Sequence, residues 1–595
     1  MSDFFKIFLA SITAIFATIF VFGLLSFLSF IFIMVSLTNE SGINVKENSV
    51  LLIETEKIGG DNIDGSPLEY MDFNTMEINK PISTPRLIST IEKAINDDNI
   101  EAIMIKYDVQ SSLGLGQIEE IRSTLEKFKK SGKRVYFSST VFSNTNYYLA
   151  SVADVIISNP KGYFFWNGLT SQYMFFGDML NNLDVKYTAI KHGKYKSAVE
   201  PFTLNKMSDA SKEQNTKLLG SIWETLTQKV SESRNISVEK LNSLADNLSI
   251  YSAESGYKHG LIDTLMYADQ QKDFLKNEID ENYHYITASK YVDAKTKAQI
   301  DKKESDNKIA VIYVEGTIID GKSGNGNAGD ESICKLIEEA RKDDDTKGVV
   351  LRVNSPGGSV TASENICRKI ELLQKEKPVI ASFGNYAASG GYYVASLADV
   401  IVSQPNTITG SIGVFMMKID VSKSLKNNLG INIETISTNK NSNFMSPLSG
   451  LNRNEEIMLQ KSVDETYLTF LGHVSKGRNL SIEEVDNIAQ GRVWSGKDAI
   501  KIGLVDGIGT LNDAIQLTAE RCGLGDDYTS YEVYNEPSSF FEFITASTSV
   551  KTMLMGSKVE KFAGKSLMKQ VEHLTSILEN NKNIQATIPY AIVVE

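Results

Sequence analysis

The chain repeats itself, and this duplication limits the folds it can adopt more than any other feature of the sequence. The segment "YYLASVADVIISNP" (147–160) returns almost letter for letter as "YYVASLADVIVSQP" (392–405). "HGLID" (259–263) returns as "IGLVD" (502–506), in the same order and at nearly the same spacing. A long repeat of this kind predicts two copies of one structural unit.

The duplication divides the 595 residues into five predicted segments. A transmembrane anchor is predicted over 7–38, an N-terminal repeat domain over 48–287, a linker over 288–307 and a C-terminal repeat domain over 308–522. The C-terminal extension, 523–595, has helical periodicity and is open to packing on the core, on a partner subunit or on a membrane surface.

The anchor is predicted from charge and length. No charged residue occurs from Ile7 to Asn39, which is longer than the roughly 20 apolar residues that cross a bilayer. A cleaved signal peptide has a shorter apolar region and ends in small residues, whereas this segment ends in "MVSLTNESG". Lys6 and Lys46 flank the segment almost symmetrically, so the flanking charges do not set its orientation.

Each repeat has the pattern of an α/β domain. In the second repeat, "KIAVIYVEG", "GVVLRVN", "PVIASFG" and "DVIVSQ" are short β-branched apolar runs, which suit strands buried on both faces. Helical patterns separate these runs, and one of them opens with Thr361 followed by Glu364, the spacing of a capping box. Strands alternating with helices predict a mainly parallel sheet.

Composition excludes several classes of function. The net charge of −13 argues against a nucleic-acid partner. The three cysteines form no CxxC pair and the five histidines are dispersed, so the sequence predicts no disulfide framework, no metal site and no cofactor.

Comparing the two repeats isolates one serine and one lysine. Ser389, within "GNYAASGGYYVAS" (384–396), falls opposite Asn144 of the first repeat. Lys196, within "KHGKYKSAVEPF" (191–202), falls opposite the neutral Ser442 and Asn443 of the second. Taken alone, Ser389 also fits a tight strand-to-helix turn and Lys196 a surface lysine. Taken together, the repeats complement each other, because the first has a lysine and the second has a serine that the other repeat lacks.

This complementarity predicts a nucleophile and its base. A serine hydroxyl needs a base to take its proton, and no histidine lies within sixty residues of Ser389. A neutral lysine serves this role in Ser-Lys variants of the catalytic triad, provided that burial lowers its pKa to about 7–8. The small or apolar residues 197–199 are expected to cover the amine, and the neighbouring Lys191 and Lys194 to lower its pKa by repulsion.

Two glycines are candidates for an oxyanion hole. Gly357 and Gly358 follow a predicted strand and let the main chain approach a substrate closely, although taken alone such a pair more often forms a tight turn. Gly390 follows Ser389 at the start of a predicted helix, so its N–H is expected to face the same oxygen. The predicted donors are the main-chain N–H groups of Gly358 and Gly390.

The segments "YKSAVEPF", "VNSPGGSV" and "YAASGGYYVAS", with the duplication and the apolar N-terminus, resemble the signal peptide peptidase A family in its long, duplicated form, also called protease IV. The resemblance covers about 40–520. It implies a Clp-peptidase-like or crotonase-like fold, with Ser389 as nucleophile and Lys196 as general base.

The resemblance also carries expectations about substrate and place. It implies a homotetramer anchored by one helix in a bacterial inner membrane, with the catalytic domains on the outer, periplasmic side. The implied activity is that of a serine endopeptidase that degrades signal peptides already cut from secreted proteins, and other short apolar peptides.

Other functions stay open at this point. A crotonase-like enzyme acting on acyl-coenzyme A would also use main-chain N–H pairs, but the chain offers no acidic pair beside Gly357 or Ser389. A non-catalytic membrane scaffold would not need both Ser389 and Lys196. Within the peptidase interpretation, quality control of misfolded envelope peptides would use the same residues.

Overall fold

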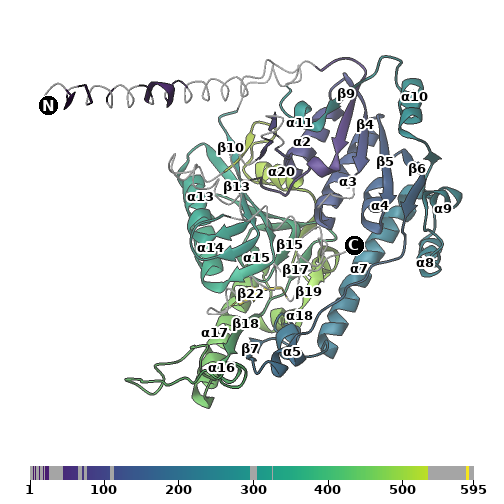
Figure 1. Ribbon diagram of the computed structural model, residues 1–595. Helices are drawn as coiled ribbons and strands as arrows, with labels where there is room; N and C mark the ends of the chain where they lie inside the picture. Colours follow the sequence, from purple (N-terminus) through teal and green to yellow (C-terminus); the bar gives the residue numbers. More distant parts are fainter. Residues whose placement is uncertain are drawn as a thin grey trace.

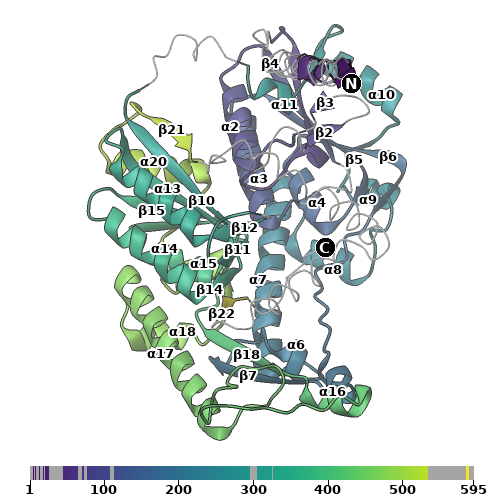
Figure 2. The ribbon, with the colours of Figure 1, turned by 60° about the vertical axis from the view of Figure 1, so that its left-hand side comes forward.

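The computed structural model describes residues 45–63, 70–72, 77–78, 80–107, 113–294, 305–324, 326–533 and 585–588, together with scattered residues among the first 25. Two similar units lie side by side (Figures 1 and 2). Most of the predicted anchor, 7–38, lies outside the described residues. Among the residues that are described, no helix is long and apolar enough to span a bilayer.

The first unit is built on a six-stranded sheet in the order β8-β6-β5-β4-β1-β9, in which all pairs are parallel. Its strands are β1 (Ser49–Glu54), β4 (Ile100–Tyr107), β5 (Arg134–Phe142), β6 (Val155–Phe164), β8 (Thr264–Leu265) and β9 (His284–Thr287). Its helices are α2 (Thr84–Ile95), α3 (Leu115–Lys130), α4 (Asn144–Ala150), α5 (Gly177–Asn182), α6 (Glu200–Thr203), α7 (Asp209–Arg234), α8 (Val238–Asp246), α9 (Ala253–Lys258), α10 (Ala268–Glu278) and α11 (Ala288–Tyr291). The short elements η1 (Thr55–Lys57), β2 (Met71–Asp72) and β3 (Glu77–Ile78) complete it.

The second unit repeats this topology. Its sheet contains the order β20-β16-β15-β13-β10-β21, all parallel, and β15 also pairs with β17, which pairs with β19. The strands are β10 (Lys308–Glu315), β13 (Thr346–Ser355), β15 (Val379–Ala388), β16 (Val400–Ser403), β17 (Ile408–Gly410), β19 (Val493–Ser495), β20 (Gly507–Ile508) and β21 (Thr529–Glu532). The helices are α13 (Asp330–Lys342), α14 (Val360–Leu373), α15 (Gly390–Ala395), α16 (Ser422–Leu429), α17 (Arg453–Arg478), α18 (Ile482–Ile488), α19 (Gly496–Lys501) and α20 (Leu511–Arg521).

Two details differ from the sequence-based expectation. Strand β21 lies in the segment predicted as the C-terminal extension, yet it pairs with β10 as β9 pairs with β1. Helix α14 does not begin with the predicted box of Thr361 and Glu364. Its N-cap is Ser359, whose backbone is extended and whose hydroxyl accepts a hydrogen bond from the N–H of Ala362, as an N-cap requires.

A third sheet joins the two units. Its order is β12-β11-β14-β22-β18-β7, formed by β12 (Asn327–Gly329), β11 (Thr317–Ile319), β14 (Gly357–Ser359), β22 (Gln585–Thr587), β18 (Val414–Asp420) and β7 (Lys186–His192). Strand β7 of the first unit pairs antiparallel with β18 of the second, from Lys186 beside Asp420 to His192 beside Val414. Figure 2 shows this pair in the lower lobe, toward which α7 runs from the first unit. The chain between β7 and α6, which carries Lys196, is thereby held against the second unit.

A buried ionic cluster also fastens the units together. The guanidinium of Arg352 on β13 donates to Asp61 over 2.7 Å and to both carboxylate oxygens of Glu120 over 2.7 and 2.9 Å. These three side chains have no exposed surface. Asp61 and Glu120 belong to the first unit, so the cluster crosses the interface and fixes α3 beside β15.

Candidate active site

Ser389 lies at the sharp turn from β15 into α15. Its φ of 55° and ψ of −114° are unusual for a residue with a side chain, and such a conformation costs of order 1–3 kcal/mol. Hydrogen bonds hold the turn, because the N–H of Ser389 donates to Gly410 over 2.8 Å and its carbonyl accepts from Tyr393 over 2.7 Å. The surrounding structure therefore enforces a strained backbone at this serine and fixes its side chain.

Lys196 reaches Ser389 from the other unit. Its Nζ lies 2.7 Å from Ser389 Oγ, and both residues are fully buried. The same nitrogen lies 3.0 Å from the carbonyl oxygen and 3.0 Å from the hydroxyl oxygen of Ser411. The two residues singled out by comparing the repeats, 193 positions apart, are therefore in direct contact.

Burial lowers the pKa of Lys196 well below its ordinary value of 10.5, because the charged amine would lose its hydration in this site. The covering residues 197–199 are buried as expected, and Ser197 accepts a hydrogen bond from Gln214. The expected repulsion from neighbouring lysines does not contribute. Lys191 donates to the main-chain oxygen of Lys196 over 3.1 Å, while Lys194 lies exposed beside Tyr195. Desolvation is the cause of the lowered pKa.

The main chain of Lys196 is held by a loop that the sequence did not single out. The N–H of Tyr195 donates to Gln490 over 2.8 Å, and the N–H of Gly491 donates to Ile412 over 2.7 Å. A β-carbon on Gly491 would lie only 2.6–2.8 Å from N, Cα and Cβ of Lys196. Gly491 also has a φ of +76°, a conformation that favours glycine. Ser411 and Gly491 position the lysine, and neither carries a sequence motif that would identify it.

The predicted oxyanion glycines lie beside Ser389. A β-carbon built on Gly390 would lie 3.0 Å from the main-chain N of Gly358, so the two predicted donors line one small volume. A β-carbon on Gly358 would lie 2.0 Å from the carbonyl oxygen of Ile318, which excludes any side chain there. Ser355 Oγ accepts from the N–H of Gly357 over 3.1 Å and donates to Gly316 over 2.6 Å, and so fixes the approach to the loop.

The equivalent positions in the other copies have structural roles. Asn144, opposite Ser389, donates from its amide to Asn167 and Gly168, and its side-chain oxygen accepts from the N–H groups of the same two residues. Ser442, opposite Lys196, lies in an exposed turn. Among these four positions, the pair that brings a base to a hydroxyl is Lys196 with Ser389.

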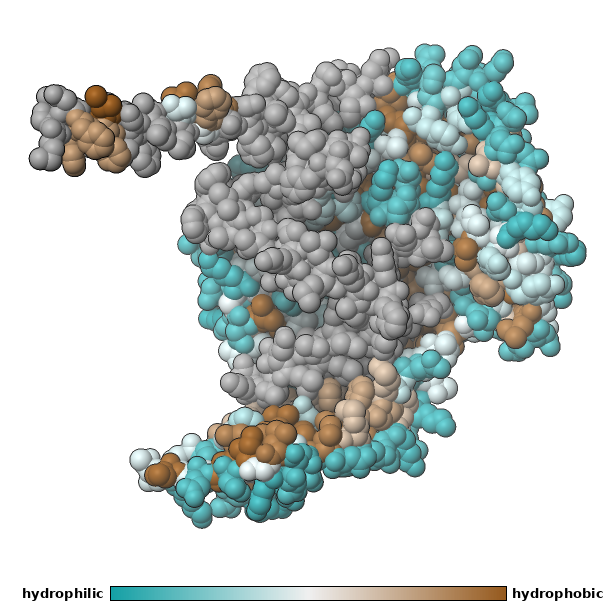
Figure 3. All heavy atoms as spheres, in the orientation of Figure 1, coloured by the Kyte–Doolittle hydropathy of each residue, from teal (hydrophilic) through white to brown (hydrophobic). Residues whose placement is uncertain are grey.

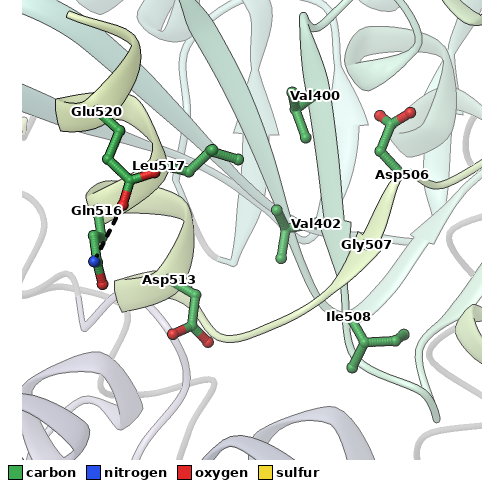
Figure 4. A pocket seen from close by; sticks show the side chains of 9 residues that line it. All are labelled: Val400, Val402, Asp506, Gly507, Ile508, Asp513, Gln516, Leu517 and Glu520. Carbon is green, nitrogen blue, oxygen red and sulfur yellow. Dashed lines mark hydrogen bonds between the residues drawn. The ribbon is translucent and has the colours of Figure 1, made fainter. Parts of the chain in front are cut away.

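One further hollow of the described structure has acidic side chains in its lining. A hollow of about 380 Å³ lies between β16, β20 and α20, lined by aliphatic side chains and by Asp506, Asp513 and Glu520 (Figure 4). These acids are already engaged, for example Asp513 with Thr510 and Glu520 with Gln516. In the described part of the chain, no group of three or more His, Cys, Asp or Glu residues is placed to hold a metal ion.

Comparison with known proteins shows which family the chain belongs to. Residues 127–287 and 371–525 match Peptidase family S49, and these two segments include Lys196 and Ser389. The chain belongs to peptidase family S49. It is 35% identical over 510 residues to Protease 4 of Haemophilus influenzae, covering 82% of each protein. It is 31% identical over 487 residues to the chloroplastic serine protease SPPA of Arabidopsis thaliana, covering 80% of this chain and 70% of that protein.

The similarity to solved structures is weaker than the similarity to these sequences. A mutant of ClpP1 from Listeria monocytogenes aligns over 34% of this chain and 94% of its own, at a TM-score of 0.22 and 15% identity. Membership of family S49 rests on sequence and makes the chain a serine peptidase with two family S49 domains of α/β fold. The acyl-coenzyme A and scaffold alternatives are thereby set aside.

Proposed function

We propose that this serine peptidase is an endopeptidase with a catalytic dyad of Ser389 and Lys196, and that it degrades cleaved signal peptides and other short apolar peptides. One observation carries the dyad. A fully buried amine with a lowered pKa lies 2.7 Å from a serine hydroxyl on a strained turn. A neutral amine can accept the proton that makes the hydroxyl nucleophilic.

The proposed reaction follows from this geometry. Ser389 Oγ attacks the substrate carbonyl and its proton passes to Lys196 Nζ. The N–H groups of Gly358 and Gly390 stabilise the negative oxygen of the tetrahedral intermediate, an effect typically worth about 2.7–4 kcal/mol per donor. Lys196 returns the proton to the leaving amine, and it then deprotonates the water that hydrolyses the ester on Ser389. Ser411 keeps the amine aimed at Ser389 throughout.

The surroundings of the dyad support apolar substrates. Ala387, Ala388 and Ile412 are buried beside the turn that carries Ser389, and no carboxylate contributes to the shifted pKa of Lys196. Apolar surroundings of this kind bind small or apolar side chains with little loss of hydration. This chemistry suits the apolar core of a signal peptide.

We also propose that the protein is a homotetramer anchored by 7–38 in a bacterial inner membrane, with its catalytic units on the periplasmic side. Figure 3 shows apolar surface gathered on the lower lobe. The exposed apolar side chains of this region include Met179, Leu183, Leu429, Ile431 and Ile436. Patches of this kind mark contacts with other subunits or with membranes.

The dyad is tested by peptide hydrolysis. The full chain in detergent is incubated with a synthetic signal peptide, beside Ser389→Ala and Lys196→Ala, and the products are identified by mass spectrometry. Both variants are expected to lose at least about 10³-fold in kcat/KM, because a triad member removed from a serine peptidase costs at least this much. Equal hydrolysis by all three proteins would rule out the dyad.

A further inference from the structure

Lys196 lies in the turn between β7 and α6, so no helix or strand of its own fixes its main chain. Its N–H donates to the carbonyl of Gly193 over 3.3 Å, within the same turn. The N–H of the preceding residue, Tyr195, donates to Gln490 of the second unit over 2.8 Å. The position of the lysine amine therefore depends on groups outside the turn that carries it.

The side chain of Gln214, on α7, bonds to both neighbours of Lys196. Its Nε2 donates to the carbonyl oxygen of Tyr195 and to the hydroxyl oxygen of Ser197, each over 3.0 Å. The Tyr195 carbonyl belongs to the planar peptide unit that also contains the N of Lys196, so this bond fixes the plane from which the lysine projects. Gln214 is 1% exposed, and a hydrogen bond shielded from water in this way is stronger than one at the surface.

The same amide also reaches the segment that holds the serine. Gln214 Oε1 accepts a hydrogen bond from the N–H of Val493 on β19 over 3.3 Å. Val493 pairs with Gly410 of β17, and the Gly410 carbonyl accepts the N–H of Ser389 over 2.8 Å. One side chain thus links the peptide before the lysine to the pair of strands that holds the serine.

Helix α7 gives this side chain a firm support. The helix begins at the N-cap Ser208, whose hydroxyl accepts a hydrogen bond from the N–H of Ser211. It packs against β19 of the second unit (Figure 1). Ser221, about two helical turns after Gln214 and so on the same face, bonds to Ser495 of β19 over 2.8 Å. Gln214 therefore projects from a helix that is itself held on the strand it contacts.

The chemistry of the site suits a neutral amide. The Tyr195 carbonyl can only accept a hydrogen bond and the Val493 N–H can only donate one, so the partners fix which end of the Gln214 amide faces each of them. A charged glutamate would have no hydrogen to donate to Tyr195, and its negative charge would favour the charged amine of Lys196. An aliphatic side chain would leave the buried carbonyl and N–H without this partner, which costs stability.

We propose that Gln214 is a positioning residue of this peptidase, which sets the distance between Lys196 Nζ and Ser389 Oγ by holding the lysine segment against β19. This inference rests on the proposed dyad. Gln214 acts through Lys196 and does not itself take or give a proton. Its loss is therefore expected to slow the transfer of the proton from Ser389 and to leave the binding of a peptide unchanged.

The test separates positioning from stability. We measure kcat and KM for a synthetic signal peptide with the full chain in detergent, beside Gln214→Met, Gln214→Asn and a control, Ser221→Ala. The control removes the hydrogen bond to Ser495, which joins the same helix and strand away from the lysine segment. Both Gln214 variants are expected to lose about 10–100-fold in kcat, since a catalytic group misplaced by about 1 Å can cost this much. Their KM is expected to stay within about threefold of the wild type, and the control is expected to keep the wild-type kcat.

Circular dichroism shows whether each variant is folded at the assay temperature. If Gln214→Met does not fold, Gln214→Asn decides, because it keeps an amide but is one methylene too short to span both partners. A wild-type kcat in the folded Gln214 variants, a loss confined to KM, or an equal loss in Ser221→Ala would overturn the inference.

Lys196→Ala in the same assay separates this inference from the proposed function. If Lys196→Ala is inactive while the Gln214 variants keep the wild-type kcat, the dyad stands and the role of Gln214 is wrong. If Lys196→Ala keeps the wild-type kcat, the dyad fails and the role of Gln214 fails with it.

Discussion

Replacing Gly491 by alanine is expected to disable the enzyme without unfolding it. The new β-carbon would lie 2.6–2.8 Å from three atoms of Lys196, whereas ordinary contacts start near 3.4 Å, so the two backbones must separate by roughly 0.6–0.8 Å. The lysine amine is held 2.7 Å from Ser389 Oγ. A misplacement of about 1 Å in a catalytic group can cost about 10²-fold in rate, and we expect a loss of this size in kcat.

The chain provides a matched control for this change. Gly503 has the same φ of +76°, but a β-carbon there would meet only Leu480, at 3.8 Å. Both alanine variants lose stability from the left-handed backbone, about 1–2 kcal/mol each, and only Gly491→Ala adds the clash with Lys196. The assay is kcat for a synthetic signal peptide, with the thermal transition followed by circular dichroism. Equal activity in the two folded variants would refute the idea that Gly491 positions the lysine.

Three further outcomes are expected. Arg352→Met leaves the carboxylates of Asp61 and Glu120 buried without their cation, so the free energy of unfolding falls by about 3–5 kcal/mol; chemical denaturation measures this, and an unchanged midpoint would contradict it. Because burial lowers the pKa of Lys196, the peptidase kcat/KM rises with pH as the amine loses its proton and levels off below pH 10.5. The unfolded chain binds that proton more tightly, so wild-type stability rises with pH up to about 10.5. Lys196→Met is expected to lack this rise, and parallel pH–stability curves would argue against a depressed pKa. Ser411→Ala removes one of the groups that aim the amine and is expected to lower kcat/KM about 10–100-fold, whereas full activity would show that the main chain alone positions Lys196.

The sequence predicted the parts of this site that the duplication makes visible. Ser389 and Lys196 stand out because each faces a residue of different chemistry in the other repeat, and the structure brings them into contact. The α/β pattern followed from short β-branched runs separated by helical periods, since a strand buried on both faces needs apolar residues throughout.

The remaining parts depend on contacts between distant segments. Ser411 and Gly491 act through position alone, and a serine or a glycine in a loop carries no signal of what its backbone touches. Strand β7 pairs with β18 rather than with a strand of its own repeat, so a pattern read within one repeat does not reveal the third sheet. The same holds for β22, whose three residues are too few to form a recognisable strand pattern.

The most direct test of the account is the pH dependence of Ser389 labelling by a fluorophosphonate, with the modified residue located by mass spectrometry. The account predicts modification of Ser389 alone, at a rate that rises as Lys196 loses its proton and is at least about 10³-fold lower in Lys196→Ala. Labelling of another serine, or equal rates in the wild type and Lys196→Ala at every pH, would contradict it.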